Sequence, residues 1–160
     1  MIVVSNTSPI NNLAAIGQLS LLQQIYGQIV IPNAVYRELT NIPVAGTIEV
    51  KTFEWIEKRE VTNSTLVKTL QLEIDEGEAE AIALAIELNA DLLLIDERIG
   101  RIVASRLGLK FIGVLGVLLE AKSQGLISTV KPLLDRLSVS GFWINEKLYN
   151  QVLNLAGESL

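Results

Sequence analysis

The sequence contains neither cysteine nor histidine among its 160 residues. The lack of cysteine excludes disulfide scaffolds, zinc ribbons, iron–sulfur clusters and thiol catalysis. The lack of histidine excludes Ser-His-Asp triads, HExxH metalloproteases and every histidine-ligated metal. A metal bound by this protein must therefore be held by oxygen atoms, which points to a hard ion such as Mg²⁺ or Mn²⁺.

Aromatic residues make up only 5% of the chain and charged residues 19%, whereas 49% are hydrophobic and the net charge is −5. No apolar run approaches the roughly 20 residues that a membrane-spanning helix needs. The first five residues lack the basic region of a signal peptide. We therefore expect a cytoplasmic protein without a membrane segment, folded as one domain over residues 1–160 with a large apolar core.

Short, uniformly apolar runs indicate strands that are covered on both faces, as in a parallel sheet. Such runs occupy residues 2–4, 29–31, 92–95 and 109–112. Helices are predicted over residues 12–26 with a break near Gly17, 32–40, 76–88, 97–107, 114–124, 132–137 and 146–155. Residues 43–64 predict a short helix or turn and then a strand near 55–61. The alternation of strands and helices favours an α/β sandwich.

Ligands of an open parallel sheet bind at the carboxyl ends of its strands. The first apolar run leads directly into Asn6 and the third into Asp96. We expect both side chains at the same edge of the sheet.

Two glutamates on predicted helices are further candidates. Glu38 has Val35 and Ile42 as its i−3 and i+4 neighbours, so its carboxylate lies beside the apolar stripe of its helix. The alternative for Glu38 is an ordinary solvated glutamate. Glu78 opens an alanine-rich helix that is apolar on all sides and must be buried. For Glu78 and the nearby Glu80, the alternative is negative charge that favours a helix N-terminus.

Carboxylates gathered at one edge of a sheet raise one another's pKa and destabilise the fold. A bound divalent cation removes this penalty, and Mg²⁺ or Mn²⁺ suits a few carboxylates together with water and a substrate phosphate. Such a site polarises a phosphodiester and activates water without histidine.

At these residues the sequence resembles the PIN-domain family, and more closely the VapC-like ribonuclease toxins of type II toxin–antitoxin systems. The resemblance covers most of residues 1–120 and rests on four segments: the first strand with Asn6-Thr7-Ser8, Ile31-Pro32 leading to Arg37-Glu38-Leu39, Gly77-Glu78-Ala79-Glu80-Ala81, and Leu92-Leu93-Leu94-Ile95-Asp96-Glu97. It implies a three-layer α/β/α sandwich with a central, mainly parallel sheet. It also implies endoribonuclease chemistry, a homodimer and a tight complex with a small antitoxin.

The same resemblance implies a cluster of four metal-binding acids. They fall at position 6, Glu38, Glu78 and Asp96, while Thr7 or Ser8 would hydrogen-bond metal-bound water or the substrate phosphate. Position 6 departs from the pattern, because Asn stands where the family has Asp. An amide offers a carbonyl oxygen but no charge, so weaker metal binding and reduced or absent activity are expected. Two origins fit the sequence: a naturally impaired relative, or a change made to tame a toxic protein.

Auxiliary roles fall to residues near these acids. Glu80 and Glu97 are possible auxiliary carboxylates. Arg98 and Arg101 are spaced i,i+3 on the helix after Asp96, where they could hold an RNA backbone. Arg106 follows on the same helix, and solvated helix charges are the alternative for all three arginines. The isolated aromatic residues Phe53, Trp55 and Trp143 could stack on bases, although such residues more often belong to a core.

Three hypotheses follow. The first is a Mg²⁺- or Mn²⁺-dependent endoribonuclease, a toxin whose activity Asn6 weakens or abolishes. The second is a non-catalytic PIN-like module that binds an antitoxin-like partner or RNA, with the helices from about residue 114 as its partner or dimer surface. The third, a nucleotide-binding or signalling domain, is disfavoured because the sequence has neither GxGxxG after the first strand nor GxxxxGK[ST] anywhere.

Overall fold

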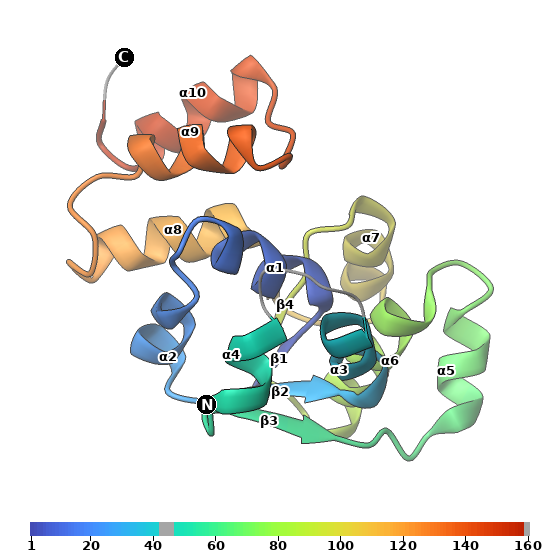
Figure 1. Ribbon diagram of the computed structural model, residues 1–160. Helices are drawn as coiled ribbons and strands as arrows, with labels where there is room; N and C mark the ends of the chain where they lie inside the picture. Colours follow the sequence, from blue (N-terminus) through green and yellow to red (C-terminus); the bar gives the residue numbers. More distant parts are fainter. Residues whose placement is uncertain (42–46, 159–160) are drawn as a thin grey trace.

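A five-stranded parallel sheet forms the centre of the protein (Figure 1). The computed structural model describes residues 1–41 and 47–158. Within these residues the strand order is β3-β2-β1-β4-β5, and every neighbouring pair is parallel. The strands are β1 (Val3–Ser5), β2 (Ile29–Pro32), β3 (Ile56–Arg59), β4 (Leu92–Leu94) and β5 (Phe111–Ile112).

Alternate residues of each strand point to opposite faces of the sheet, and both faces are buried. Val3 belongs to the core cluster on one face, and Val4 belongs to the cluster on the other. Leu94 and Leu93 of β4 divide between the two clusters in the same way. This is why the strands read as continuous apolar runs in the sequence.

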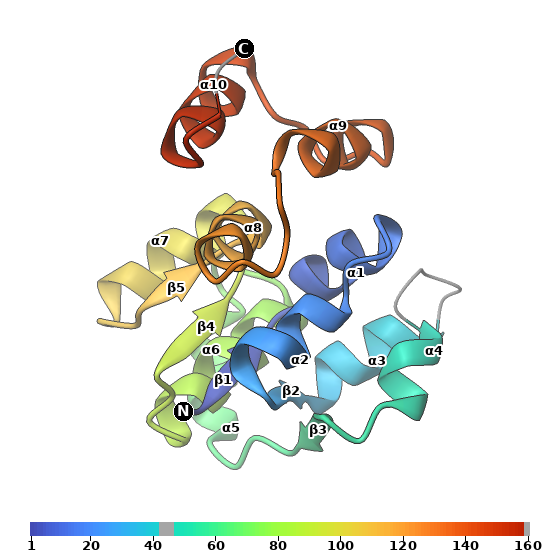
Figure 2. The ribbon, with the colours of Figure 1, turned by 90° about the vertical axis from the view of Figure 1, so that its left-hand side faces the viewer.

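Helices cover both faces of the sheet (Figure 2). They are α1 (Thr7–Ala15), α2 (Ser20–Tyr26), α3 (Asn33–Asn41), α4 (Thr47–Thr52), α5 (Ser64–Leu70), α6 (Glu76–Glu87), α7 (Arg98–Arg106), α8 (Val114–Ser123), α9 (Lys131–Val139) and α10 (Glu146–Leu155). One core cluster takes side chains from α1, α2, α3 and α8, and the other from α5, α6 and α7. The predicted α/β/α sandwich is therefore confirmed.

The helix α6 is buried almost throughout, as its composition predicts. Small side chains such as Ala79, Ala81 and Ala83 are at most 1% exposed, and they let α6 pack closely on the sheet. The predicted break near Gly17 is also confirmed, since this residue has φ +70° between α1 and α2.

Three local predictions were wrong. The first helix begins at Thr7 rather than at residue 12, because Pro9 lies in its first turn, where a helix has no amide partner to lose. The last strand contains only Phe111–Ile112 instead of residues 109–112. The helix α5 was not predicted, although the Asn63 side chain accepts a hydrogen bond from Leu66 N–H and so caps it.

The segment over residues 43–64 agrees with its prediction where it is described. It contains α4 and then β3, which lies within the predicted strand near residues 55–61. Ile42, used above to place Glu38, and residues 43–46 lie outside the described residues.

The C-terminal helices α9 and α10 stack beyond α8 (Figures 1 and 2). Leu134 and Val152 join them to the same core cluster as α1 and α8. Val139, Trp143 and Leu155 remain at least 75% exposed. None of the described helices has the length and apolar character that crossing a membrane requires.

Candidate active site

The carboxyl ends of the strands and the N-termini of the helices meet at one edge of the sheet. The helices α1, α3, α7 and α8 directly follow β1, β2, β4 and β5, so each begins at this edge. The helix α6 leads into β4 and therefore also begins there. Helix N-termini carry partial positive charge and free N–H groups, so this edge favours carboxylates and anions.

Asn6 lies where the sequence predicts, immediately after β1. It is the N-cap residue of α1, and its backbone N–H donates to the Leu94 carbonyl at 2.9 Å. The residue is only 3% exposed, and its side-chain Oδ1 is buried without a hydrogen-bond partner among the described residues. A buried acceptor without a partner carries a desolvation penalty of roughly 1–3 kcal/mol. Such an oxygen is suited to a cation or to a donor from a ligand.

Glu38 lies on α3 and is half-buried rather than fully exposed to solvent. Its carboxylate accepts a hydrogen bond from the Thr7 hydroxyl. Burial raises the pKa of Glu38, and the nearby carboxylates of Asp75 and Glu76 raise it further, against the lowering effects of Thr7 and Arg37.

Glu78 is the most perturbed acid at this edge. It occupies the first turn of α6 and is only 8% exposed. Burial raises the pKa of Glu78 to about 8, and the negative charges of Asp75, Glu97 and Glu38 contribute to the rise. A carboxyl group with this pKa exchanges its proton near neutral pH, which is a common property of functional sites.

Asp96 follows β4 and faces the start of α8, as the strand pattern predicts. Its Oδ1 accepts the Val114 backbone N–H at 2.9 Å, and its Oδ2 lies 3.5 Å from the side-chain nitrogen of Asn12. Burial raises the pKa of Asp96, although these two hydrogen bonds act in the opposite direction. Asp96 thus acts as a cap for α8, whose N-cap residue is a glycine without a side chain.

The auxiliary residues divide into two groups. Ser8 donates a hydrogen bond to Glu97 at 3.2 Å, and the charge of Glu97 acts on both Glu78 and Asp96. These residues therefore lie with the acids. Glu80 instead accepts the Ala34 N–H at 3.0 Å and caps the N-terminus of α3, which is a structural contact.

The predicted RNA-binding arginines also divide. Arg98 and Arg101 line a cavity of about 360 Å³ together with Asp96 and Phe111. The Arg101 guanidinium lies 5.3 Å from the centre of the Phe111 ring. Arg106 turns away and forms a salt bridge with Glu73.

The aromatic residues behave as core or surface groups. Trp55 is 9% exposed, and the Phe53 ring stacks on it with a 5.5 Å separation between ring centres. Trp143 is 80% exposed in the segment between α9 and α10. Phe111 lines the same cavity as Asp96, and its position in a two-residue strand gave no sequence signal for this neighbourhood.

Asp75 and Asn12 were not foreseen as parts of the site. Asp75 accepts the Glu78 N–H at 2.8 Å as the N-cap of α6, and its spacing of three residues from Glu78 resembles a capping box, which could have signalled the contact. Asn12 lies 84 positions before Asp96 in the chain, and no local sequence pattern predicts their contact.

The donor set fits a hard divalent cation. It consists of carboxylate oxygens and the buried Oδ1 of Asn6, which are the ligands that Mg²⁺ and Mn²⁺ prefer. Within the part of the chain that the structure describes, no three acidic side chains are close enough to form a ready-made cage. A cation at this edge would therefore take at most two of the carboxylates directly and would keep several waters.

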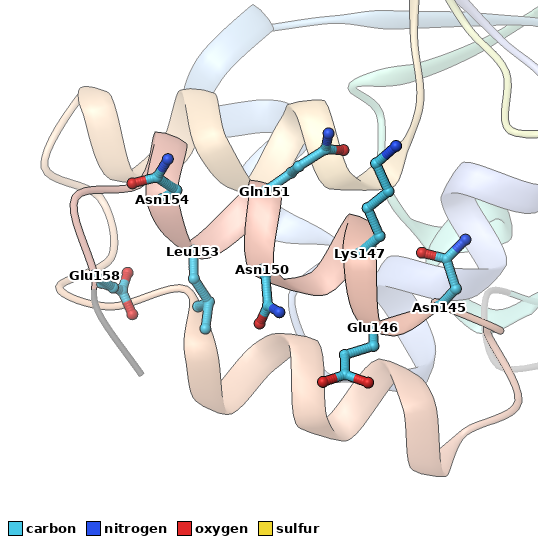
Figure 3. A pocket seen from close by; sticks show the side chains of 8 residues that line it. All are labelled: Asn145, Glu146, Lys147, Asn150, Gln151, Leu153, Asn154 and Glu158. Carbon is cyan, nitrogen blue, oxygen red and sulfur yellow. The ribbon is translucent and has the colours of Figure 1, made fainter.

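A larger cavity lies elsewhere in the described residues. It has a volume of about 1000 Å³, and its lining comes almost entirely from α10 and the residues that flank it (Figure 3). None of the candidate site residues borders it.

The three-layer fold and the acidic sheet edge define a class of small α/β proteins suited to metal-dependent phosphodiester chemistry. The model of a family described as a PIN domain matches residues 2–158. The chain therefore belongs to the PIN-domain family, whose members are generally nucleases that use divalent metal ions. No curated protein matches the sequence.

Proposed function

We propose that this chain is a Mg²⁺- or Mn²⁺-dependent endoribonuclease, the toxin of a toxin–antitoxin pair, whose activity is weakened or abolished by Asn6. One observation carries the proposal: Glu38, Glu78 and Asp96 reach the same sheet edge, and burial raises the pKa of all three. Evolution retains such a costly arrangement where a site needs it. A cation relieves the cost by neutralising the buried charge.

The proposed ligands of the cation are Asn6, Glu38, Glu78 and Asp96, of which one or two carboxylates would bind it directly and the others through water. When bound, the cation supplies Lewis-acid stabilisation of phosphate charge and lowers the pKa of water. Thr7 orients Glu38 through its hydroxyl. Asn12 orients Asp96 through its amide.

The remaining steps fall to other side chains of the chain. Glu78, whose carboxylate a bound cation would hold in its ionised form, is the group suited to orient an attacking water and to accept its proton. Arg98 and Arg101, in the cavity that also borders Asp96, bind the phosphate backbone on one side of the reacting phosphodiester. The water oxygen forms a bond to phosphorus as a phosphorus–oxygen ester bond breaks.

The direct test is RNA cleavage by the native chain and by Asn6→Asp, with Mg²⁺, with Mn²⁺ and with EDTA. We expect metal-dependent cleavage that is stronger in Asn6→Asp and disappears in EDTA. Asp96→Asn, combined with Asn6→Asp, is the matched control, since it removes one charge from the same site and should abolish the gain. If Asn6→Asp cleaves no RNA with either metal, the nuclease proposal fails.

A second candidate function is a non-catalytic module that binds RNA or a small antitoxin in the cytoplasm. Two observations favour it: Asn6 lacks the charge expected at its position, and the C-terminal region from α9 to α10 exposes Val139, Trp143 and Leu155. Light scattering would show whether the chain is a homodimer. RNA binding without turnover in both the native chain and Asn6→Asp would select this function over the nuclease.

A further inference from the structure

Each of the three carboxylates stands against the backbone of a glycine. A Cβ atom built on Gly77 would lie 2.4 Å from Oε1 of Glu38, and one on Gly113 would lie 2.2 Å from Oδ1 of Asp96. A Cβ on Gly100 would lie 3.0 Å from Oε2 of Glu78 and 2.7 Å from Cδ1 of Ile95. Separations below 3.0 Å are incompatible with van der Waals radii, so any side chain at Gly77 or Gly113 would displace the carboxylate.

The three glycines lie at or near the N-termini of three different helices. Gly77 and Gly100 lie in the first turns of α6 and α7, and Gly113 is the N-cap residue of α8. Without a Cβ atom, each helix start lets a carboxylate approach its positive end closely. Asp96 shows the result, because its Oδ1 both occupies the space of the missing Cβ and accepts the Val114 N–H.

Backbone conformation does not explain these glycines. Glycines such as Gly17, Gly27 and Gly108 have positive φ, which side chains rarely adopt. Gly77, Gly100 and Gly113 have no such φ. Among the described glycines, they alone have a carboxylate oxygen within 3.0 Å of the Cβ position. The space itself is the reason for glycine here.

We propose that Gly77, Gly100 and Gly113 are positioning residues of the acidic site, each leaving space for one carboxylate at a helix start. A methyl group would overlap the carboxylate at Gly77 and Gly113 and would crowd it at Gly100. This inference rests on the proposed function only for its purpose, which is to place the oxygens that receive a cation. The positions of the carboxylates against the three glycines are a property of the metal-free chain and can be tested without a metal.

The glycine Gly116 provides a matched control. It lies inside α8, and the three atoms nearest to its Cβ position all belong to Ile112, whose own Cβ is 3.0 Å away. Gly116→Ala therefore adds a methyl group at a packed helix position, as Gly100→Ala does. The atoms nearest to this methyl group belong to Ile112 and not to an acid. Its effect on thermal unfolding measures the general packing cost of such a change.

The first experiment measures Mn²⁺ affinity by calorimetry in the full chain and in Asn6→Asp. We expect Gly77→Ala, Gly100→Ala and Gly113→Ala each to weaken Mn²⁺ binding by about 10–100-fold, as loss of a ligand-orienting contact does. Gly116→Ala should leave the affinity unchanged. If the three variants bind Mn²⁺ as tightly as their parents, the positioning role is refuted.

A rescue variant separates displacement of the acid from general damage to the fold. In Gly77→Ala, the further change Glu38→Asp shortens the acid and withdraws its carboxylate from the new methyl group. We expect the double variant to bind Mn²⁺ more tightly than Gly77→Ala, although Glu38→Asp alone binds it more weakly than the parent. A double variant no better than Gly77→Ala would contradict the steric account.

The carboxyl ¹³C resonances of the metal-free chain test placement without any metal. Gly77→Ala should move the resonance of Glu38, and Gly113→Ala that of Asp96, while Gly116→Ala moves neither. If Mn²⁺ binds neither parent but these resonances move, the proposed function fails and the positioning role stands. If Mn²⁺ binds the parents and the resonances stay, the positioning role fails by itself.

Discussion

The pH dependence of stability gives a sharp test of the acidic site, because the chain has no histidine or cysteine. Those side chains ordinarily dominate titration near neutral pH. A carboxyl group whose pKa is raised into this range therefore titrates without interference from histidine or cysteine. Glu78, with its ordinary pKa of 4.5 raised to about 8 in the fold, is that group.

The direction in which stability changes with pH follows from the protons that the folded and unfolded chains bind. Between pH 4.5 and about 8 the folded chain keeps the Glu78 proton, whereas the unfolded chain has released it. The folded state binds more protons in this window, so the free energy of unfolding falls as pH rises. Stability from this group is fully present below the unfolded pKa and is lost as pH passes through the folded pKa.

The size of the effect follows from the two pKa values. Each pH unit within the window lowers the free energy of unfolding by up to about 1.4 kcal/mol, and the whole difference amounts to about 5 kcal/mol. Since a small domain has only about 5–15 kcal/mol of stability, the effect should dominate the pH profile. Glu78→Gln removes the titration but keeps the shape of the side chain.

The assay is urea unfolding of the native chain and Glu78→Gln at intervals from pH 4 to pH 9, without divalent metal. We expect the native chain to lose stability steadily with rising pH and Glu78→Gln to show a much flatter profile. Relative to the native chain, the free energy of unfolding of Glu78→Gln should rise by about 5 kcal/mol from the lowest to the highest pH. Parallel profiles would refute both the buried acid and the argument built on it.

Glu87→Gln is the matched control, since it makes the same change near the other end of α6. Although burial acts to raise it, hydrogen bonds from Thr62 and Asn63 hold the pKa of Glu87 below its ordinary value. Glu87 is therefore ionised in both folded and unfolded chains above about pH 5. Glu87→Gln should change stability by a constant amount across the window.

The remaining predictions concern residues beside the acids. Arg101→Ala should weaken RNA binding and reduce the slope of log affinity against log salt by about 0.7. Arg106→Ala, which breaks the exposed salt bridge with Glu73, should leave both the affinity and the slope unchanged. Equal losses of RNA affinity in the two variants, measured by filter binding, would contradict the different roles given to Arg101 and Arg106. Glu80→Ala should lower the free energy of unfolding by about 1 kcal/mol through loss of the cap on Ala34, with unchanged Mn²⁺ affinity by calorimetry. A loss of Mn²⁺ affinity in that variant would instead place Glu80 in the metal site.

Much of the fold could be predicted because its signals are local. Uniform apolar runs mark strands buried on both faces, and the alanine-rich stretch that begins at Gly77 marks a buried helix. The errors arose where local signals are weak or conflict. Pro9 reads as a helix breaker unless the helix is known to start at Thr7, and the two residues of β5 pair only because β4 lies beside them.

The candidate site could be predicted only in part. Asn6 and Asp96 follow apolar runs, so the rule for parallel sheets brings them to one edge. Glu80 resembles Glu78 in sequence, yet it points to α3 and caps Ala34, which depends on how two helices pack. The glycines opposite the acids carried no signal, because each acid meets a glycine from a different helix.

Asn6 provides the final test of whether this edge is a metal site. In Asn6→Asp a carboxylate replaces a side chain that is 3% exposed and whose Oδ1 has no partner among the described residues. Without metal, the added charge should lower the free energy of unfolding at pH 8 more than at pH 5, since burial and the neighbouring acids disfavour it. With Mn²⁺ the added charge should instead destabilise the fold less at pH 8 than at pH 5, because a ligand that binds the folded state stabilises it more when it binds more tightly. Thermal unfolding with and without Mn²⁺ measures both effects, and Gly116→Ala serves as a control that leaves the charge unchanged. If Mn²⁺ raises the unfolding temperature of Asn6→Asp no more than that of the native chain, position 6 is not a ligand of the cation.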